Sequence, residues 1–456
     1  MKLTAAVLAF ASVMICADLS AQAVPEGSQA YRTDRGYLRT PNFRVDPFRH
    51  VTIPHWGLVT SFGASGQNNA INFRDVGALI FLSDEDNNPD GLLYGDILDL
   101  LGLIPRGSGL AASVQSEGGV HLGGPLGRHF SLGLSAQVRA YGGANLDDDF
   151  VALLRDGNGA RQDFTLGDSR LDVLASSEFG AHALIRTGGL GGMDGAQLTF
   201  GFGGRYIIPH FYARGSSTVA NGGLIRITGE GVTANVALEK AVAITGSSGG
   251  WDDFDFSDLI NRKGSGIAGD FLLRIEWPTS GLALEAMVAN VGKVTVENVE
   301  LAGWSFNVAT TELEEVLDSL DAFPEELYPD SIDIQFRDFV VSDTAETLDV
   351  TLPRIVRFTG SAWANRILQL DVSATLPVTG DFAAPLTVDL GSTWRFSRVI
   401  PIRFGLIFGG NQGLGYTGGI GIESRHFLMR FAAGSLGGFV QDATGLVGRF
   451  EWGFFF

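Results

Sequence analysis

One segment of the sequence carries oxygen ligands at the spacing that calcium-binding loops use. Asp86, Asn88 and Asp90 alternate along it, and Gly91 follows at the position where such a loop turns sharply. The twelfth position, which normally supplies a bidentate glutamate, is Ile97, so the ligand set is incomplete. Asn-Pro-Asp-Gly also forms a turn without any ion. The alternatives are a Ca²⁺ ion at this loop and a solvated turn, and no other cofactor is expected.

Patterns associated with catalysis are incomplete elsewhere in the chain. Residues 413–418 fit the spacing Gly-x-Gly-x-x-Gly, but no helix pattern follows, and a dinucleotide site needs strand, turn and helix. Residues 167–169 (Gly-Asp-Ser) are similar to an esterase block without its downstream Asp-x-x-His, and the histidines show no His-Glu-x-x-His spacing. The prediction is a protein that is not an enzyme.

Charged residues of both signs recur at every second position of several long apolar segments. Alternate side chains of a β-strand point to opposite faces, so each such segment has one apolar face and one charged face. The residues that we predict to line the lumen of a barrel in this way are Arg139, Arg205, Arg274, Glu276, Glu285, Asp389, Arg395, Arg403, Arg449 and Glu451. Two roles are open for them: pairs that fill and stiffen the lumen, or the lining of a route for a polar or amphipathic solute.

The segments that carry these two faces are longer than the strands of most soluble proteins. The segments 129–141, 197–205 and 386–397 alternate throughout, close to the length that a tilted strand needs to cross a bilayer. A soluble β-sandwich also alternates, but its outward face is polar and its strands average about five or six residues. We therefore predict an all-β fold, a transmembrane antiparallel β-barrel of about 14 strands with short helices in long loops.

The end of the chain shows this alternation most clearly. Four aromatic residues share one parity there: Phe450, Trp452, Phe454 and Phe456. Arg449 and Glu451 fall on the other parity, which suits a wall with lipid outside and a polar lumen inside. The segment resembles the C-terminal strand by which bacterial outer-membrane barrels are recognised for assembly. That resemblance implies outer-membrane lipid and the barrel-assembly machinery as partners.

The start of the chain has the features of an export signal. Lys2 precedes an apolar stretch, and residues 21–23 (Ala-Gln-Ala) form a small-x-small cleavage site. The alternative is a lipoprotein signal ending at Cys16, but no small residue precedes that cysteine. Residues 1–23 are predicted to be a cleaved signal peptide, and export together with the predicted barrel places the protein in the bacterial outer membrane.

The remaining chain divides into two predicted parts. Residues 24–55 are polar and rich in arginine, and they form either a periplasmic arm or a hatch folded into the lumen. Residues 56–456 form the barrel. The formal net charge of −19 would repel nucleic acid, so no nucleic-acid partner is expected. No run of about 18 apolar residues follows the signal, so no spanning helix is predicted.

The connections between strands fall into two classes. Tight turns are predicted at 278–281, 397–399 and 423–425. Long polar insertions are predicted at 83–109, 143–177, 244–266 and 303–352. Short apolar stripes near Ile97, near Phe150 and after Thr311 predict helices in these insertions. Such helices either pack on the barrel rim or border a pocket for an apolar ligand.

Two parts of the sequence are similar to one family. They are residues 264–270 (Gly-Ser-Gly-Ile-Ala-Gly-Asp) with 288–292 (Val-Ala-Asn-Val-Gly), and residues 400–406 (Ile-Pro-Ile-Arg-Phe-Gly-Leu) with the glycine-rich hairpin 413–422. In order and spacing they resemble FadL-like outer-membrane proteins, a group of long-chain fatty-acid transporters, type IX secretion barrels and other relatives. The resemblance implies a fourteen-stranded barrel with an N-terminal hatch and a site for hydrophobic molecules. None of that family's ligand-contacting residues is matched here, so none is assigned.

Two functions follow as hypotheses. The first is a channel or transporter for small hydrophobic or amphipathic molecules. The alternative is a non-transporting barrel that acts as a docking or secretion-associated interaction protein, suggested by the size of the 303–352 insertion.

Overall fold

The structure describes most of the barrel and little of the chain before it. In this computed structural model the described residues are 47–48, 55–72, 74, 102–105, 109–149, 151–152, 163–165, 169–187, 195–228, 231–245, 262–277, 280–310, 333–365, 367–379, 386–397, 399–410, 413–424, 426–439 and 442–456. The predicted signal peptide, nearly all of the arm, and the loop with Asp86, Asn88 and Asp90 lie outside these ranges. Those predictions stay predictions.

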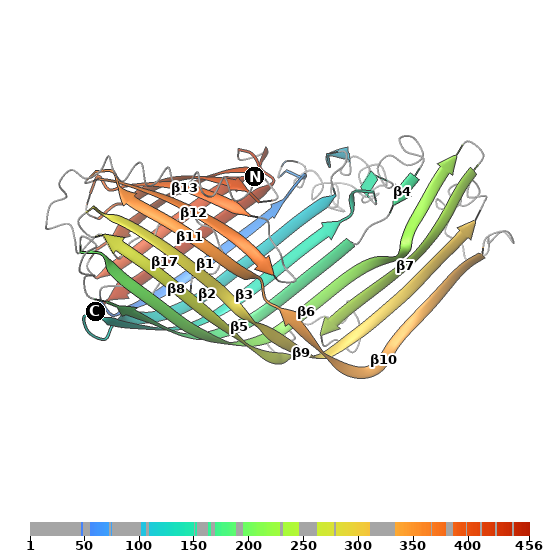
Figure 1. Cartoon of the computed structure of the whole chain (residues 1–456), viewed down its shortest axis with the longest axis horizontal. Coiled ribbons are helices and arrows are strands. Elements are labelled where there is room, and N and C mark those ends of the chain that lie inside the picture. Colours follow the sequence, from blue (N-terminus) through green and yellow to red (C-terminus); the bar gives the residue numbers. More distant parts are fainter. Residues whose placement is uncertain are drawn as a thin grey trace, which may run out of the picture.

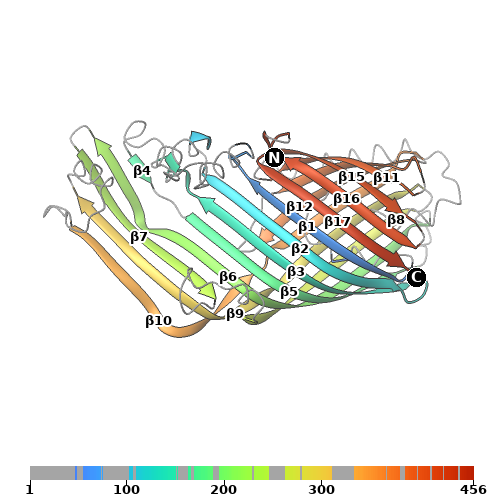
Figure 2. The ribbon, with the colours of Figure 1, turned by 180° about the vertical axis from the view of Figure 1, so that it is seen from behind.

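Fourteen antiparallel strands pair edge to edge, and the first pairs with the last, so the sheet closes into a barrel (Figure 1). In order around the wall they are β1 (Gly57–Asn68), β2 (Leu110–Pro125), β3 (Phe130–Leu146), β5 (Ser169–Arg186), β6 (Gln197–Thr228), β8 (Gly264–Trp277), β9 (Leu282–Thr310), β11 (Arg354–Trp363), β12 (Leu368–Thr379), β13 (Thr387–Trp394), β14 (Ile402–Gly409), β15 (Leu414–Glu423), β16 (Phe427–Leu436) and β17 (Gly445–Phe455). Closure is visible from behind, where β17 lies beside β1 (Figure 2) and Phe62 is opposite Phe450. The predicted all-β barrel is confirmed.

Three further strands lie outside the closed ring. They are β4 (Asp163–Thr165), β7 (Gly231–Thr245) and β10 (Asp333–Thr351). The distal part of β6 pairs with β4 and β7, and the distal part of β9 pairs with β7 and β10. Together these segments form an extension of the sheet beyond the barrel (Figure 1).

The observed strands correct three predicted insertions. Residues 303–310 belong to β9 and 333–351 to β10, so much of the predicted insertion 303–352 is strand. Likewise, the insertion predicted at 143–177 ends where β5 begins, at Ser169, and the one at 244–266 ends in β8, at Gly264. The prediction for 303–352 was wrong because it recognised strands by an apolar face at alternate positions. Strands that project beyond a bilayer do not need such a face.

The outer face of the barrel is apolar. Along β17, Phe450, Trp452 and Phe454 are exposed, whereas Arg449 and Glu451 are buried on the inner face. Phe404 of β14 is 60% exposed on the outer face. In a closed barrel the backbone hydrogen bonds are made between strands, which is the condition for strands to cross lipid. The protein is therefore built as a transmembrane barrel.

The two ends of the barrel differ. The connections at 126–129, 278–281, 364–367 and 424–426 are short, and they lie at the end where β1 begins and β17 finishes. Five of the seven tryptophans lie at this end: Trp56, Trp277, Trp363, Trp394 and Trp452. Tryptophan prefers the membrane–water interface, so these rings mark one edge of the membrane-embedded band.

A short helical turn packs on the opposite rim. Residues 148–149 and 151–152 are helical, and the Val151 amide donates to the Asp147 carbonyl oxygen at 3.1 Å. Val151 packs against Ile104 and Leu146. The helix predicted near Phe150 is thus confirmed, whereas the one after Thr311 lies outside the described residues. Within the described part of the chain, no helix has the length and apolarity needed to span a membrane.

Candidate functional site

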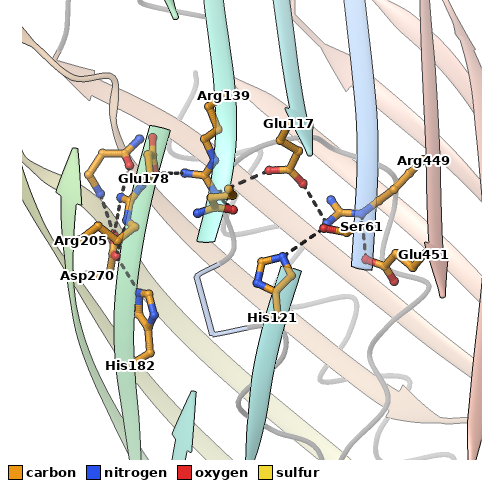
Figure 3. Close-up of polar contacts among 12 residues, drawn as sticks. Ser61, Glu117, His121, Arg139, Glu178, His182, Arg205, Asp270, Arg449 and Glu451 are labelled. Carbon is orange, nitrogen blue, oxygen red and sulfur yellow. Dashed lines mark hydrogen bonds and ion pairs between the residues drawn. The ribbon is translucent and has the colours of Figure 1, made fainter. Parts of the chain in front are cut away.

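A continuous run of buried charges follows the inner wall, and we call it the charged belt. Figure 3 shows its part from Asp270 to Glu451. It consists of Arg139, Arg205, Arg395, Arg430, Arg449, Glu117, Glu178, Asp270, Glu423 and Glu451. Its members come from β2, β3, β5, β6, β8, β15, β16 and β17, with Arg395 directly after β13. Inward-pointing alternate positions on neighbouring strands bring them together.

Arg205 is the centre of the belt. Its Nε and Nη2 atoms each lie 2.9 Å from a different oxygen of Asp270, and its Nη1 donates to Glu178 Oε2. The Arg205 side chain is 0% exposed. A two-pronged arginine–carboxylate pair is geometrically specific and strong when both partners are desolvated. His182 Nε2 adds a third contact, 3.1 Å from Asp270 Oδ2.

A β-bulge in β9 completes this centre. Asn290 has a φ of 62°, and the β8–β9 register shifts between Gly269 and Phe271. Asparagine tolerates this left-handed conformation better than most residues. The Asn290 amide donates to Asp270 Oδ1 at 3.0 Å, and its side-chain oxygen accepts from Arg205. Its Nδ2 donates to the carbonyl oxygen of Pro353 at 2.9 Å, which ties the bulge to the start of β11.

The belt continues through alternating partners. Arg139 Nη1 lies 3.0 Å from Glu178, and its Nη2 lies 3.6 Å from Glu117. Glu117 is 2.9 Å from Arg449, which in turn is 2.9 Å from Glu451. The last links run from Glu451 to Arg430 at 3.6 Å, from Arg430 to Glu423 at 2.8 Å, and from Glu423 to Arg395 at 2.9 Å. Every arginine of the belt therefore has a carboxylate partner.

Glycines allow three polar pairs to form over an intervening strand. Gly203 of β6 lies between His182 and Asp270 in the strand register. Gly63 lies in the same way between Arg449 and Glu117, and Gly391 beneath the pair of Arg403 and Asp371. A Cβ atom on Gly203 would overlap the His182 ring, and one on Gly391 would overlap the Arg403 guanidinium. Glycine is thus required on the middle strand wherever a side chain must cross that strand to reach its partner.

We expect Gly203→Ala to destabilise the folded barrel by about 1–3 kcal/mol, because the methyl group must displace the His182 ring. Unfolding in urea, followed in lipid vesicles, measures the change. Gly204→Ala is the matched control, because the next residue faces outward and a Cβ atom there meets nothing within 4 Å. An equal loss in both variants would show that the close approach at Gly203 is unimportant.

Apolar clusters flank the Arg205 centre above and below on the same inner face. The upper apolar cluster, toward the long loops, consists of Tyr141, Leu174, Ile207, Tyr212, Ala268, Val294, Val296, Val299, Val350 and Leu352. The lower apolar cluster, toward the short turns, consists of Phe48, Leu184, Leu272, Met287, Ala289 and Ile355. On β5 the order along the inner face is Leu174, Glu178 and Leu184. Along the barrel axis, the inner wall therefore carries an apolar band, a charged band and a second apolar band.

Phe48 is one of three described residues of the predicted arm, with Pro47 and His55, and it lies inside the barrel. Its side chain is 1% exposed and packs with Leu184 and Leu272 of the lower apolar cluster. Its ring meets the His182 ring edge-on, with 5.3 Å between centroids. The arm therefore reaches the lumen at this residue, directly beside the polar contacts of Asp270.

The structure places all ten predicted lumen residues on the inner side and pairs them in different ways. Five belong to the charged belt: Arg139, Arg205, Arg395, Arg449 and Glu451. The other five lie outside the belt. Arg274 pairs with Glu276 on the same strand, and Glu285 lies 3.7 Å from Arg357. Arg403 pairs with Asp371, and Asp389 accepts a hydrogen bond from Ser373. Their role in lining a solute route stays a prediction.

Five members of the belt are not among the lumen residues predicted from the sequence: Glu117, Glu178, Asp270, Glu423 and Arg430. Glu178 falls just after a segment expected to be a loop, although Leu171, Val173 and Ala175 alternate with Asp172, Leu174 and Ser176. Glu423 sits at a tight turn. The alternation of charges in 169–186 was the available signal, and it was weakened by the apolar residues of the upper cluster on the inner face.

Comparison with known proteins gives likenesses of fold. No protein-family model matches this chain, and no curated protein matches its sequence. A mutant of the TodX monoaromatic hydrocarbon channel is 9% identical with a TM-score of 0.45, over 93% of this chain and 97% of that one. A Pseudomonas aeruginosa FadL homologue is 12% identical with a TM-score of 0.41, over 90% and 93%. The P. putida toluene transporter TodX is 9% identical with a TM-score of 0.43, over 90% and 92%.

A FadL homologue is thus one of the solved structures to which this chain is similar in fold. The closed barrel is established by its own strand pairing, and the site is described from this chain's residues alone.

Proposed function

We propose that this protein is a channel of the bacterial outer membrane for small hydrophobic or amphipathic molecules. The observation that carries the proposal is the apolar, charged, apolar order of the inner wall. The lumen of a water-filled barrel is polar, whereas here buried apolar side chains such as Leu174, Ile207 and Met287 share the inner face with the charges. Apolar surface with a few convergent polar groups is the usual lining of a small-molecule site.

The proposal includes a gate formed by the predicted arm. Phe48 fills the lower apolar cluster, and it packs on His182, which contacts Asp270. Residues 24–55 would then act as a hatch that occupies the lumen at rest. A solute that competes for the same apolar wall would displace the Phe48 ring and open the path.

Phe48→Ala should raise solute uptake about tenfold or more. Truncating a buried phenylalanine costs about 3–5 kcal/mol of packing, and about 1.4 kcal/mol is enough to shift an equilibrium tenfold. The measurement is uptake of a radiolabelled aromatic alcohol by bacterial cells that express the protein. Phe43→Ala, in the same arm but outside the described residues, serves as a comparison. Unchanged uptake in Phe48→Ala, at equal protein levels, would refute the gate.

The channel itself is tested by solute class. Cells that express the protein should take up a hydrophobic solute faster than cells without it, and should show no gain for a sugar of similar size. Uptake of neither solute, from protein shown to be folded in the membrane, would contradict the channel.

The alternative function is docking of a protein partner, and the extension favours it. β7, β10 and the distal parts of β6 and β9 form a sheet that stands beyond the closed barrel. Deleting residues 218–243 together with 301–347 would remove most of the extension and keep the segments that pair with β5 and the lower part of β9. Under the docking function this variant loses the partner and keeps its barrel, whereas under the channel function uptake through the barrel continues.

A further inference from the structure

We infer that the solute of this barrel is uncharged, and that the charged belt selects it. This inference rests on the proposed channel function and names the class of molecule that the channel accepts. The inference follows from the balance of charge in the belt and from the buried polar atoms near it that have no hydrogen-bond partner.

The belt is electrically balanced. It contains five arginines and five carboxylates, linked in one chain of ion pairs from Asp270 to Arg395. Its central members are shielded from water, since the side chains of Arg205, Glu178 and Asp270 are at most 1% exposed. Three pairs elsewhere on the wall keep the same balance: Arg274 with Glu276, Arg357 with Glu285, and Arg403 with Asp371.

A charged solute would upset this balance. A carboxylate that approached Arg139 or Arg205 would have to displace Glu178 or Asp270, and one negative charge would then remain buried without compensation. An ammonium group would displace an arginine in the same way. A buried charge without a partner is strongly unfavourable, so the belt discriminates against both signs by the repulsion it already contains. An uncharged solute meets no such penalty.

The belt also offers atoms that suit a hydroxyl group. Within the described part of the chain, Glu178 Oε1, Ser176 Oγ, Ser135 Oγ and Arg139 Nε are buried and have no hydrogen-bond partner. Ser176 lies opposite Arg139 in the β3–β5 register, and Glu178 is the next inward-facing residue along β5. A carboxylate oxygen accepts a hydrogen bond from a hydroxyl donor, and a serine can donate or accept. Glu178 Oε1 and Ser176 Oγ, at adjacent inward positions of β5, therefore suit a neutral head group that carries an O–H, whereas Ser135 lies two inward positions from Arg139 along β3.

The apolar part of such a solute has its own surface. Leu174 is one inward position above Ser176, and Tyr141 is one above Arg139, so the upper apolar cluster begins directly beside these atoms. A molecule with an apolar body and a single hydroxyl, such as an alkyl or aryl alcohol, can contact both surfaces at once. The geometry thus favours an alcohol over the acid or amine of the same skeleton.

The test uses three ligands with one skeleton and different head groups: 4-phenylbutanol, 4-phenylbutanoate and 4-phenylbutylammonium. Equilibrium binding is measured on the full-length protein in lipid nanodiscs, with empty nanodiscs subtracted. The inference predicts that the alcohol binds at least about tenfold more tightly than either ion. Equal or tighter binding of the carboxylate or the ammonium would overturn it and leave the channel intact. Binding of none of the three would count against the channel and the inference together.

Charge variants sharpen the test. Glu178→Gln leaves the belt with one surplus positive charge, so binding of the carboxylate should tighten about tenfold, whereas Arg139→Gln should do the same for the ammonium. Asp349→Asn, an exposed carboxylate of β10, is the control and should leave the ranking unchanged. If both belt variants fold and neither alters the ranking, the belt is not the selecting feature. The ranking in the unaltered protein decides the inference even if they do not fold.

Discussion

Asp270→Ala should lower the free energy of unfolding by about 3–5 kcal/mol, the cost of breaking a buried ion pair from one side. The substitution leaves Arg205 with Glu178 as its remaining described carboxylate partner, and it removes an acceptor from His182 and from the Asn290 amide. None of these groups is exposed to water that would replace the lost bonds. Urea unfolding of the protein in lipid vesicles measures the change.

Two comparisons separate this effect from general damage. Asp349→Ala removes one partner of the exposed Lys293–Asp349 pair, where we expect a far smaller loss of stability than in Asp270→Ala because water solvates both groups. There, the Lys293 ammonium and the Thr295 hydroxyl hold the pKa of the Asp349 carboxyl below its ordinary value. Adding Arg205→Met to Asp270→Ala should recover stability, because the stranded charge is gone. A double variant less stable than Asp270→Ala would contradict this account of the belt.

Phe431→Arg should destabilise the membrane-embedded barrel by about 2–4 kcal/mol, the cost of an arginine on the lipid face near the bilayer midplane. Phe431 is 54% exposed on the outer face of β16, between Ile420 and Phe450 in the strand register. Phe431→Leu keeps the surface apolar and should cost less than about 1.5 kcal/mol. Unfolding from vesicles of graded thickness measures both variants. A cost for arginine no larger than for leucine would place this face outside the lipid.

The fold was predictable because the membrane imposes a strict pattern on strands. Because lipid lies on one side of the wall and a polar lumen on the other, apolar residues such as Phe450 alternate with charged residues such as Arg449. That alternation predicted the barrel and the inward direction of its charges. The extension was not predictable in this way. Its strands lie outside the closed ring, so the requirement for one lipid-facing apolar parity does not apply to them.

The pairing of the charges was harder to predict than their direction. The contact between Arg403 and Asp371 passes over a whole strand, and it depends on Gly391 lying between them. Such a pair follows from the register of three strands, which the sequence of any one strand does not contain. The bulge at Asn290 was missed for the same reason, since its left-handed backbone is set by the shift against β8.

A cysteine scan of residues 446 to 454, with each label tested for quenching by a lipid-borne quencher, is the most direct measurement of how this barrel sits in its membrane. Positions 446, 448, 450, 452 and 454 should be quenched, and positions 447, 449, 451 and 453 should be protected, because only the first set shares the outer face. Quenching without this two-residue period, or quenching of the positions of Arg449 and Glu451, would show that the charged parity does not face a lumen.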